Sequence, residues 1–151
     1  MMEKSRPAAK AVVKGAPDYP EISGTVNFYP TNQGVLVVAE VYGLPHSRGP
    51  CEGGVFAFHI HEGRSCTGNE EDAFADAAGH YNPQDCEHPH HAGDLPPLFD
   101  NDGYAWSAVL TDRFTVDEIL GRTVIIHRDV DDFTTQPSGA AGAKIACGVI
   151  R

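Results

Sequence analysis

Short alternating runs of apolar residues, separated by turn residues, recur along the whole chain and constrain its fold more than any other feature. The runs are "KAVVKG", "SGTVNFYP", "GVLVVAEVYG", "GVFAFHIH", "GYAWSAVL", "RTVIIH" and "AKIACGVI". Sixteen glycines and eleven prolines supply the breaks between them. Runs of this length and period, with such breaks, are typical of an antiparallel sandwich or barrel. The sequence therefore predicts an all-β protein.

Two segments depart from this pattern. The segment "TVDEILG" is the one predicted helix, because Thr115 and Glu118 have the spacing of a capping box and Gly121 suits a helix C-terminus. Residues 62–102 lack strand periodicity, and loops of this length in a compact domain are usually functional or disordered. A bound metal ion could order the loop. Its acidic run "NEEDAFAD" lacks the spacing and the glycine of an EF-hand, so we expect a solvated loop there.

The length and charge of the chain limit its organisation and its partners. A chain of 151 residues fits one domain with its own core. Residues 1–19 are expected to be a flexible segment that could include a first strand. The formal net charge is -10, and beyond residue 14 only 7 basic residues face 20 acidic ones. Such a surface repels nucleic acid and anionic membranes, so neither is an expected partner.

The apolar segments are too short for membrane insertion or a secretory signal. No window approaches the roughly 20 apolar residues that span a bilayer. The amino terminus carries lysines and small residues but lacks the apolar core of a signal peptide. We therefore expect a cytoplasmic protein, although a mature secreted or periplasmic form would have the same features.

Histidines in and beside the long loop offer two kinds of metal site. Alternation along "FAFHIHE" places His59 and His61 on one strand face, about 7 Å apart, where both can reach one ion. A surface or core role is the competing interpretation for this pair, and also for His127 at the end of "RTVIIH". The loop adds further donors, namely His80, His88, His90, His91 and Asp94. Three imidazoles and a carboxylate suit a closed structural zinc site, whereas four imidazoles suit copper with an axial opening.

Five motifs, in order, resemble the copper/zinc superoxide dismutase family, nearer to its bacterial branch. They are "FHIHEGRSC", "AGHYNP", "HAGDLP", "GRTVIIHRDVDDF" and "SGAAGAKIACGVI", within roughly residues 20–151. The resemblance implies a flattened, eight-stranded Greek-key β-barrel with a long metal-binding loop and an active-site electrostatic loop. It also implies an enzyme that converts superoxide to dioxygen and hydrogen peroxide. A non-catalytic protein for copper delivery or metal buffering on the same fold is the alternative.

The resemblance also implies the ligands of both ions. Copper would be held by His59, His61, His80 and His127, and zinc by His80, His88, His91 and Asp94. His80 would bridge the two ions and carry a proton in the reaction, and Asp131 would hydrogen-bond one histidine of each site. His90 would be the spare histidine, although the contracted spacing from His88 to His91 would let it compete for zinc.

One position departs from the family pattern. Lys144 stands where family members usually have an arginine beside the copper opening. Arginine offers an anion a rigid planar fork, whereas lysine offers a flexible point charge, so attraction of superoxide should survive better than its orientation. We therefore predict that Lys144 is a catalytic residue and that activity could be reduced.

The four cysteines are too few for a disulfide scaffold and too dispersed for a zinc ribbon. By resemblance, Cys66 and Cys147 form an intrasubunit disulfide that limits the freedom of the loop after the copper strand. A second disulfide between Cys51 and Cys86 is favoured over two free thiols, and Cys86 as a metal ligand stays open. The "CGVI" segment resembles a dimer edge, so a homodimer is an expectation by analogy of fold.

Overall fold

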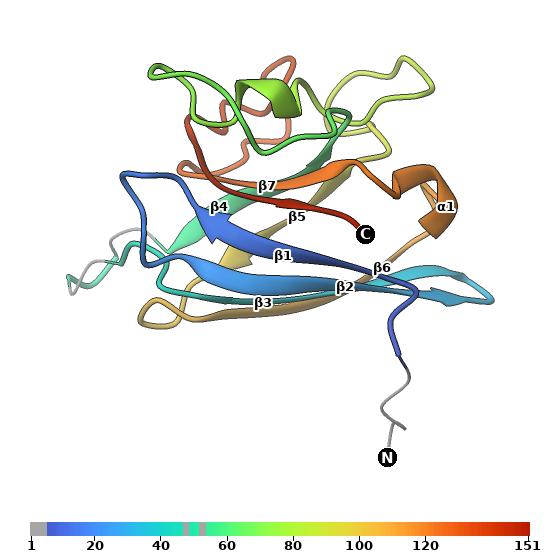
Figure 1. The fold of residues 1–151 in the computed structure, drawn as a ribbon, viewed down its shortest axis with the longest axis horizontal. Coiled ribbons are helices and arrows are strands. Elements are labelled where there is room, and N and C mark those ends of the chain that lie inside the picture. Colours follow the sequence, from blue (N-terminus) through green and yellow to red (C-terminus); the bar gives the residue numbers. More distant parts are fainter. Residues whose placement is uncertain (1–5, 47–48, 52–53) are drawn as a thin grey trace.

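Eight antiparallel strands form one sheet that curls into a nearly closed barrel in the computed structural model, which describes residues 6–46, 49–51 and 54–151. The strands are β1 (Ala9–Gly15), β2 (Ser23–Thr31), β3 (Gly34–Tyr42), β4 (Val55–His61), β5 (Asp94–Phe99), β6 (Ala105–Thr111), β7 (Thr123–His127) and β8 (Lys144–Val149). Their order in the sheet is β5-β4-β7-β8-β1-β2-β3-β6. Figure 1 shows them in two layers, with β1, β2 and β3 in one layer and β4, β5 and β7 in the other. The neighbours β4–β7 and β8–β1 are not consecutive in the chain, as in a Greek key. The predicted fold is confirmed.

Apolar residues that alternate along the strands fill the interior of the barrel. In β3 every second residue from Val35 to Val41 is buried, and Phe28 of β2 and Phe58 of β4 belong to the same core. Burying one such side chain contributes about 1.5–3 kcal/mol. The interior therefore holds the strands in a fixed register, including the strands that carry histidines.

The alternating run "KAVVKG" near the amino terminus is a strand of the barrel. It lies within β1, which pairs with both β2 and β8. Alternate residues of β1 are buried, and Ala11 and Val13 contribute to the core. The division of the chain at residues 19 and 20 stays a prediction.

The segment 62–102 contains a strand that its sequence pattern did not indicate. A register shift in the pairing of β5 with β4 gives β5 one extra residue. Because of this bulge, Leu95 and Leu98 are both buried in the core although they are three positions apart. Pro96 and Pro97 lack the N–H donor of a regular strand residue. The prediction of a structureless segment throughout 62–102 is therefore wrong. Strand β5 was not indicated because it has neither the alternation nor the usual composition of a strand.

The predicted helix is present, and a second short helix accompanies it. Helix α1 (Val116–Ile119) begins after Thr115, whose side chain and backbone form a capping box with Glu118 as predicted. The second is a 3-10 turn, η1 (Ala75–Ala77), at the end of the run "NEEDAFAD". No helix in the described part of the chain is long and apolar enough to span a membrane.

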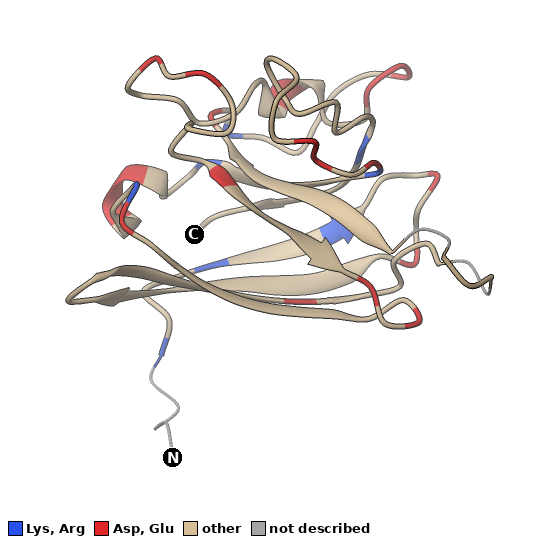
Figure 2. Cartoon of the chain, turned by 180° about the vertical axis from the view of Figure 1, so that it is seen from behind, with Lys and Arg blue, Asp and Glu red and all other residues tan. Residues whose placement is uncertain are grey.

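Two loops cover the outer face of β4 and β7. Figure 1 shows residues 62–93 and 128–143 gathered on one side of the barrel, next to these strands. All five residues of β7 and six of the seven residues of β4 are buried as a result, so both faces of these strands are enclosed. Acidic residues are spread over the loops and the helix, and basic residues are few (Figure 2). Six of the eight histidines are buried in the layer between the barrel and the loops, and His46 and His90 are exposed.

Candidate metal centre

Three histidines project from the outer face of β4 and β7. His59 and His61 alternate along β4 with Phe58 and Ile60, which belong to the barrel core. His127 is the last residue of β7, the antiparallel neighbour of β4. All three histidine side chains are buried beneath the loops, although they lie outside the core.

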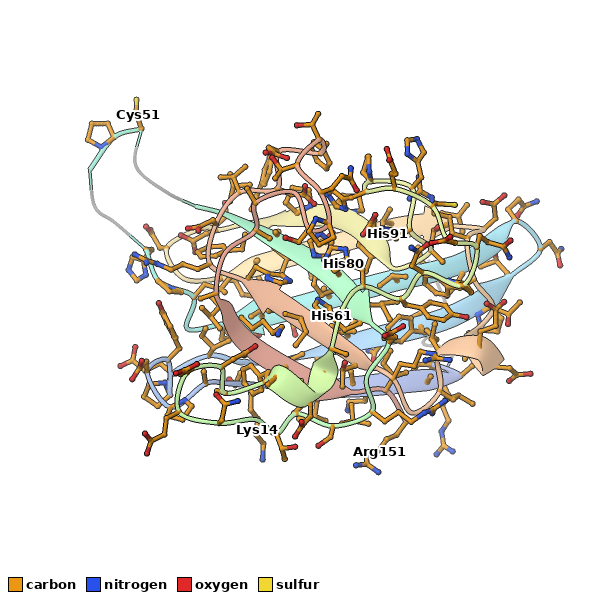
Figure 3. The ribbon with its side chains drawn as sticks, turned by 90° about the horizontal axis from the view of Figure 1, so that it is seen from above. Lys14, Cys51, His61, His80, His91 and Arg151 are labelled. Atoms are coloured by element: carbon orange, nitrogen blue, oxygen red, sulfur yellow. A yellow bond between two sulfur atoms is a disulfide. The ribbon has the colours of Figure 1, made fainter. Side chains whose placement is uncertain are left out.

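The long loop brings a fourth histidine to these three. An isolated β-bridge joins His80 to His61, the last residue of β4. The ligand atoms of His59, His61, His80 and His127 all lie within 4.8 Å of one another. In Figure 3 the side chains of His61 and His80 lie close together, with His91 next to His80. We call these four residues the first cluster.

Main-chain carbonyls fix the protons of two rings in the first cluster. His61 Nδ1 donates to the carbonyl oxygen of Ala78 at 2.8 Å, and His127 Nδ1 donates to that of Gly142 at 3.1 Å. Because a neutral imidazole carries only one proton, the Nε2 atoms of both rings then present lone pairs. These two Nε2 atoms face each other at 3.2 Å. A cation between them would relieve the repulsion of the lone pairs.

Burial keeps the rings of His61 and His127 neutral. It lowers the pKa of His61 well below its usual value, and the proximity of His127 lowers it further. Burial, followed by the effect of His59, lowers the pKa of His127 to about 3. Neutral imidazole is the form that binds metal ions. A proton is therefore a poor occupant of the space between these two rings at neutral pH.

Two more ring nitrogens in the first cluster have no partner. His59 Nδ1 and His80 Nε2 are buried without a hydrogen bond to any residue that the structure describes. Such an atom costs roughly 1–3 kcal/mol, and most buried polar atoms are paired. With the two Nε2 atoms of His61 and His127, four imidazole nitrogens are available in one small volume. This donor set fits a copper or zinc ion.

A second cluster lies on the other side of His80. The ligand atoms of His59, His80, His88 and Asp94 lie within 4.8 Å of one another. The Asp94 carboxylate is 2.8 Å from His80 Nδ1 and 2.9 Å from His88 Nδ1. His91 lies outside this tightest group, but its Nδ1 atom is 3.2 Å from His80 Nδ1 and 3.3 Å from Asp94 Oδ1. We include His91 because of these two contacts and count His59 with the first cluster, so that the second cluster comprises His80, His88, His91 and Asp94.

Asp131 connects the two clusters. Its carboxylate accepts hydrogen bonds from His59 Nε2 at 2.8 Å and from His88 Nε2 at 2.7 Å. Burial raises the pKa of Asp131, but these hydrogen bonds outweigh burial and hold the pKa well below its usual value. The ionised carboxylate therefore keeps a proton on the Nε2 atom of each ring. The Nδ1 atoms of His59 and His88 therefore carry lone pairs that can bind a metal ion. The shared carboxylate also couples the orientation of His59 in the first cluster to that of His88 in the second.

A pocket of about 500 Å³ opens beside the first cluster, and its lining includes His61, His80, His127 and Lys144. A bulge in the pairing of β7 with β8 makes Lys144, rather than Ile145, the partner of His127. Bulges near functional sites commonly redirect one side chain in this way. The predicted cation, Lys144, therefore lies in the lining of the pocket beside the first cluster.

Lys144 has a carboxylate partner that sequence reasoning missed. Its Nζ atom forms an ion pair with Asp72 Oδ2 at 2.6 Å. Asp72 lies in the acidic run "NEEDAFAD", whose Phe74 is buried against Ile125 and Cys147. The interpretation of this run as a solvated loop is therefore wrong for these two residues. Nothing in the run distinguishes Asp72 from its acidic neighbours, so the sequence offered no signal for the contact.

The predicted disulfide between Cys66 and Cys147 is confirmed, with a Cα–Cα distance of 5.8 Å. It ties the loop after β4 to β8. The favoured second disulfide is wrong, because Cys51 and Cys86 are free thiols in the described structure. Figure 3 shows Cys51 on a loop that projects away from the histidines.

Two histidines lie apart from the clusters. His90 is exposed and belongs to neither of the groups found among the described residues, although its neighbours His88 and His91 are buried. His46 is exposed in a different loop, where its Nδ1 atom lies 3.2 Å from the carbonyl oxygen of Leu44. The folded loop thus separates His90 from the two histidines on either side of it.

Gly139 has no side chain that would collide with the hydrogen bond between Asp131 and His88. We therefore expect Gly139→Ala to destabilise the metal-free protein by roughly 2–4 kcal/mol. A Cβ atom there would lie 2.0 Å from Asp131 Oδ1 and 2.6 Å from His88 Nε2, and the φ of 74° also disfavours alanine. Denaturant unfolding of the metal-free variant measures the effect. Gly79→Ala is the matched control, because its Cβ atom would have no described atom within 4 Å. Equal stability of the two variants would contradict the assigned role of Gly139.

A comparison with protein families finds one match that covers most of the chain. Residues 22–150 match the family described as "Copper/zinc superoxide dismutase (SODC)". The matched range begins just before β2 and ends just after β8, so it includes both histidine clusters.

Two relatives and one crystal structure show similarity to the same family. The chain is 35% identical to superoxide dismutase [Cu-Zn] 2 of Aquifex aeolicus over 146 residues, which is 87% of this chain and 80% of the relative. It is 36% identical to superoxide dismutase [Cu-Zn] of Actinobacillus pleuropneumoniae over 135 residues, or 78% and 70% of the two chains. The crystal structure of a SOD-like protein from Bacillus subtilis is similar, with a TM-score of 0.74 and 28% identity, covering 92% of this chain and 95% of that one.

Proposed function

The chain belongs to the copper/zinc superoxide dismutase family, and on this basis we propose that it converts two superoxide anions and two protons into dioxygen and hydrogen peroxide. Its substrate is then a small anion, for which the pocket beside the first cluster offers both space and the cation Lys144.

The placement of His80 carries this proposal. Its Nδ1 atom faces the Asp94 carboxylate in the second cluster, while its Nε2 atom belongs to the first cluster and has no described hydrogen-bond partner. A histidine that only stabilised the fold would be expected to have its buried ring nitrogens paired. A ring that faces two metal-binding clusters is instead suited to bridging two ions.

The donor sets support one ion in each cluster. We assign copper to His59, His61, His80 and His127, and zinc to His80, His88, His91 and Asp94. The assignment follows the donor chemistry, because four imidazoles suit copper and a set that includes a carboxylate suits zinc. Copper, when bound, would supply the one-electron chemistry that oxidises one superoxide and reduces the next.

The chain's own residues would position the substrate and supply a proton. Lys144, in the lining of the pocket, would attract the anion, while the acidic surface elsewhere repels it. His80 Nε2 would hold one of the two protons that the reduced oxygen requires and release it into the pocket. Asp131 would keep His59 and His88 in the orientation that both ligand sets need.

The proposal is tested by measuring the metal content and the superoxide consumption of one purified, remetallated sample. We expect one copper and one zinc per chain, with rapid consumption of superoxide. A protein that binds both metals but leaves superoxide unconsumed would instead be a copper-delivery or metal-buffering protein. That outcome would overturn the enzymatic proposal and retain the two sites.

Replacing Asp94 with alanine should release zinc, because Asp94 contacts all three histidines of the second cluster and is its only carboxylate. Some copper-dependent activity should remain, since Asp94 lies outside the first cluster. Metal analysis after dialysis measures the change. Zinc that stays at one equivalent in Asp94→Ala, but is lost when His90 is also replaced by alanine, would make His90 the fourth ligand.

A further inference from the structure

Lys144 lies where two pockets of the protein meet. Lys144 lines the histidine pocket, and it also lines a neighbouring groove in which four acidic residues outnumber one further cation, Arg128. The acidic residues are Asp18, Glu70, Glu71 and Asp72. Asp72 lines the groove and does not belong to the lining of the histidine pocket. The 2.6 Å ion pair therefore holds the ammonium group against the acidic groove, at the boundary of the pocket that would admit the substrate.

The carboxylate of Asp72 is held firmly in this position. Its Oδ1 atom accepts a hydrogen bond from the N–H group of Phe74 at 3.0 Å, and Phe74 is buried against Cys147. The Cys66–Cys147 disulfide anchors the same loop to β8, the strand that begins with Lys144. The partner of Lys144 is therefore preorganised, and little additional ordering is needed to keep the pair formed.

The pair changes what Lys144 can offer to an anion. An ammonium group and a carboxylate at 2.6 Å together carry no net charge, so their field weakens rapidly with distance. The side chain of Lys144 is only 17% exposed, which limits its contact with water and with other charges. An anion that makes direct contact with the ammonium group must share or displace the carboxylate.

We propose that Asp72 is a positioning residue that competes with small anions for Lys144. It holds the ammonium group toward the acidic groove, and an anion in the histidine pocket gains full contact with Lys144 only when Asp72 gives up its place. Asp72 thus lowers the affinity of the pocket for anions. This inference rests on the proposed function, because it concerns anion access to the proposed copper site.

The test is a titration of the copper- and zinc-loaded protein with azide, a small monoanion, followed by visible absorption. Asp72→Asn removes the charge and keeps an Oδ1 acceptor for Phe74, so the loop should stay folded. We expect azide to bind about fivefold more tightly to this variant at low ionic strength. In a Lys144→Gln background the same substitution should change the affinity by less than about twofold, because no ammonium group is left to release.

Glu71→Gln is the matched control, because it removes one charge from the same loop at a residue without a described contact to Lys144. Its expected effect on azide affinity is less than about twofold. Two results would overturn the inference. Weaker azide binding to Asp72→Asn would mean that Asp72 presents Lys144 to anions. An equal increase in azide affinity from Asp72→Asn in the wild-type and Lys144→Gln backgrounds would mean that Asp72 acts only through its charge and not through Lys144.

Two further measurements keep the test decisive. Should Asp72→Asn unfold, Asp72→Ser retains an oxygen acceptor near Phe74 and carries the same expectation. The azide affinity is independent of turnover, so it also separates this inference from the proposed function. A protein that consumes no superoxide but shows the expected azide pattern would overturn the proposed function and support the role of Asp72.

Discussion

Replacement of His127 by alanine is expected to lower superoxide consumption by more than about a hundredfold while zinc stays bound. Loss of a group that merely orients a metal ligand commonly costs about 10–100-fold, and His127 is itself an assigned ligand. Its Nε2 atom lies 3.2 Å from that of His61, and three imidazoles would remain in the first cluster. Metal analysis and superoxide consumption of the remetallated variant are the measurements. The second cluster does not include His127, so its zinc should be retained.

His90→Ala is the control for this substitution, because His90 is an exposed histidine outside both clusters. It should retain wild-type activity and both metals. Near-normal turnover by His127→Ala would remove the copper assignment. Loss of zinc together with activity in that variant would mean that the two clusters cannot be occupied independently.

Removal of the Cys66–Cys147 disulfide should destabilise the protein by about 4 kcal/mol in the chain-entropy model, because the bond closes a long loop with a sequence separation of 81 residues. For a chain of this size, the loss corresponds to a fall of roughly 10 °C in the melting temperature. Thermal unfolding of a metal-free Cys66→Ala/Cys147→Ala variant measures the effect without a contribution from metal binding.

The free thiols provide the control for the disulfide. A Cys51→Ser/Cys86→Ser variant should melt close to the wild type, because neither residue is in a disulfide. A comparable fall in both double variants would show that the loss reflects substitution of cysteine in general. An unchanged melting temperature without the Cys66–Cys147 bond would show that the loop after β4 is held by its other contacts.

The parts of the fold that follow a simple period were predictable from the sequence. Alternation along "GVFAFHIH" placed Phe58 and Ile60 in the core and the two histidines on the other face. The capping box of Thr115 and Glu118 is a local signal, and the helix formed where that signal indicated. Strand β5 was missed because its bulge removes the period and its prolines oppose the usual composition of a strand.

The candidate site was predictable only in part, because its geometry depends on contacts between distant segments. The types and spacing of the histidines indicated metal binding, but the division into two ligand sets came from the family resemblance. The contacts that fix the rings were hidden from sequence reasoning, since the carbonyl groups of Ala78 and Gly142 belong to residues without a chemical signature. Asp72 was missed for a similar reason, because 72 positions separate it from Lys144.

The two prolines of β5 also affect the tendency of the protein to aggregate through the edge of its sheet. Strand β5 is an edge strand in the sheet order. An edge strand can pair with a strand of another molecule, and repeated pairing of this kind forms fibres. Such pairing needs N–H groups on the edge, which Pro96 and Pro97 do not have. This edge of the barrel is therefore a poor template for intermolecular growth, and the protection is independent of metal because it is built into the covalent structure.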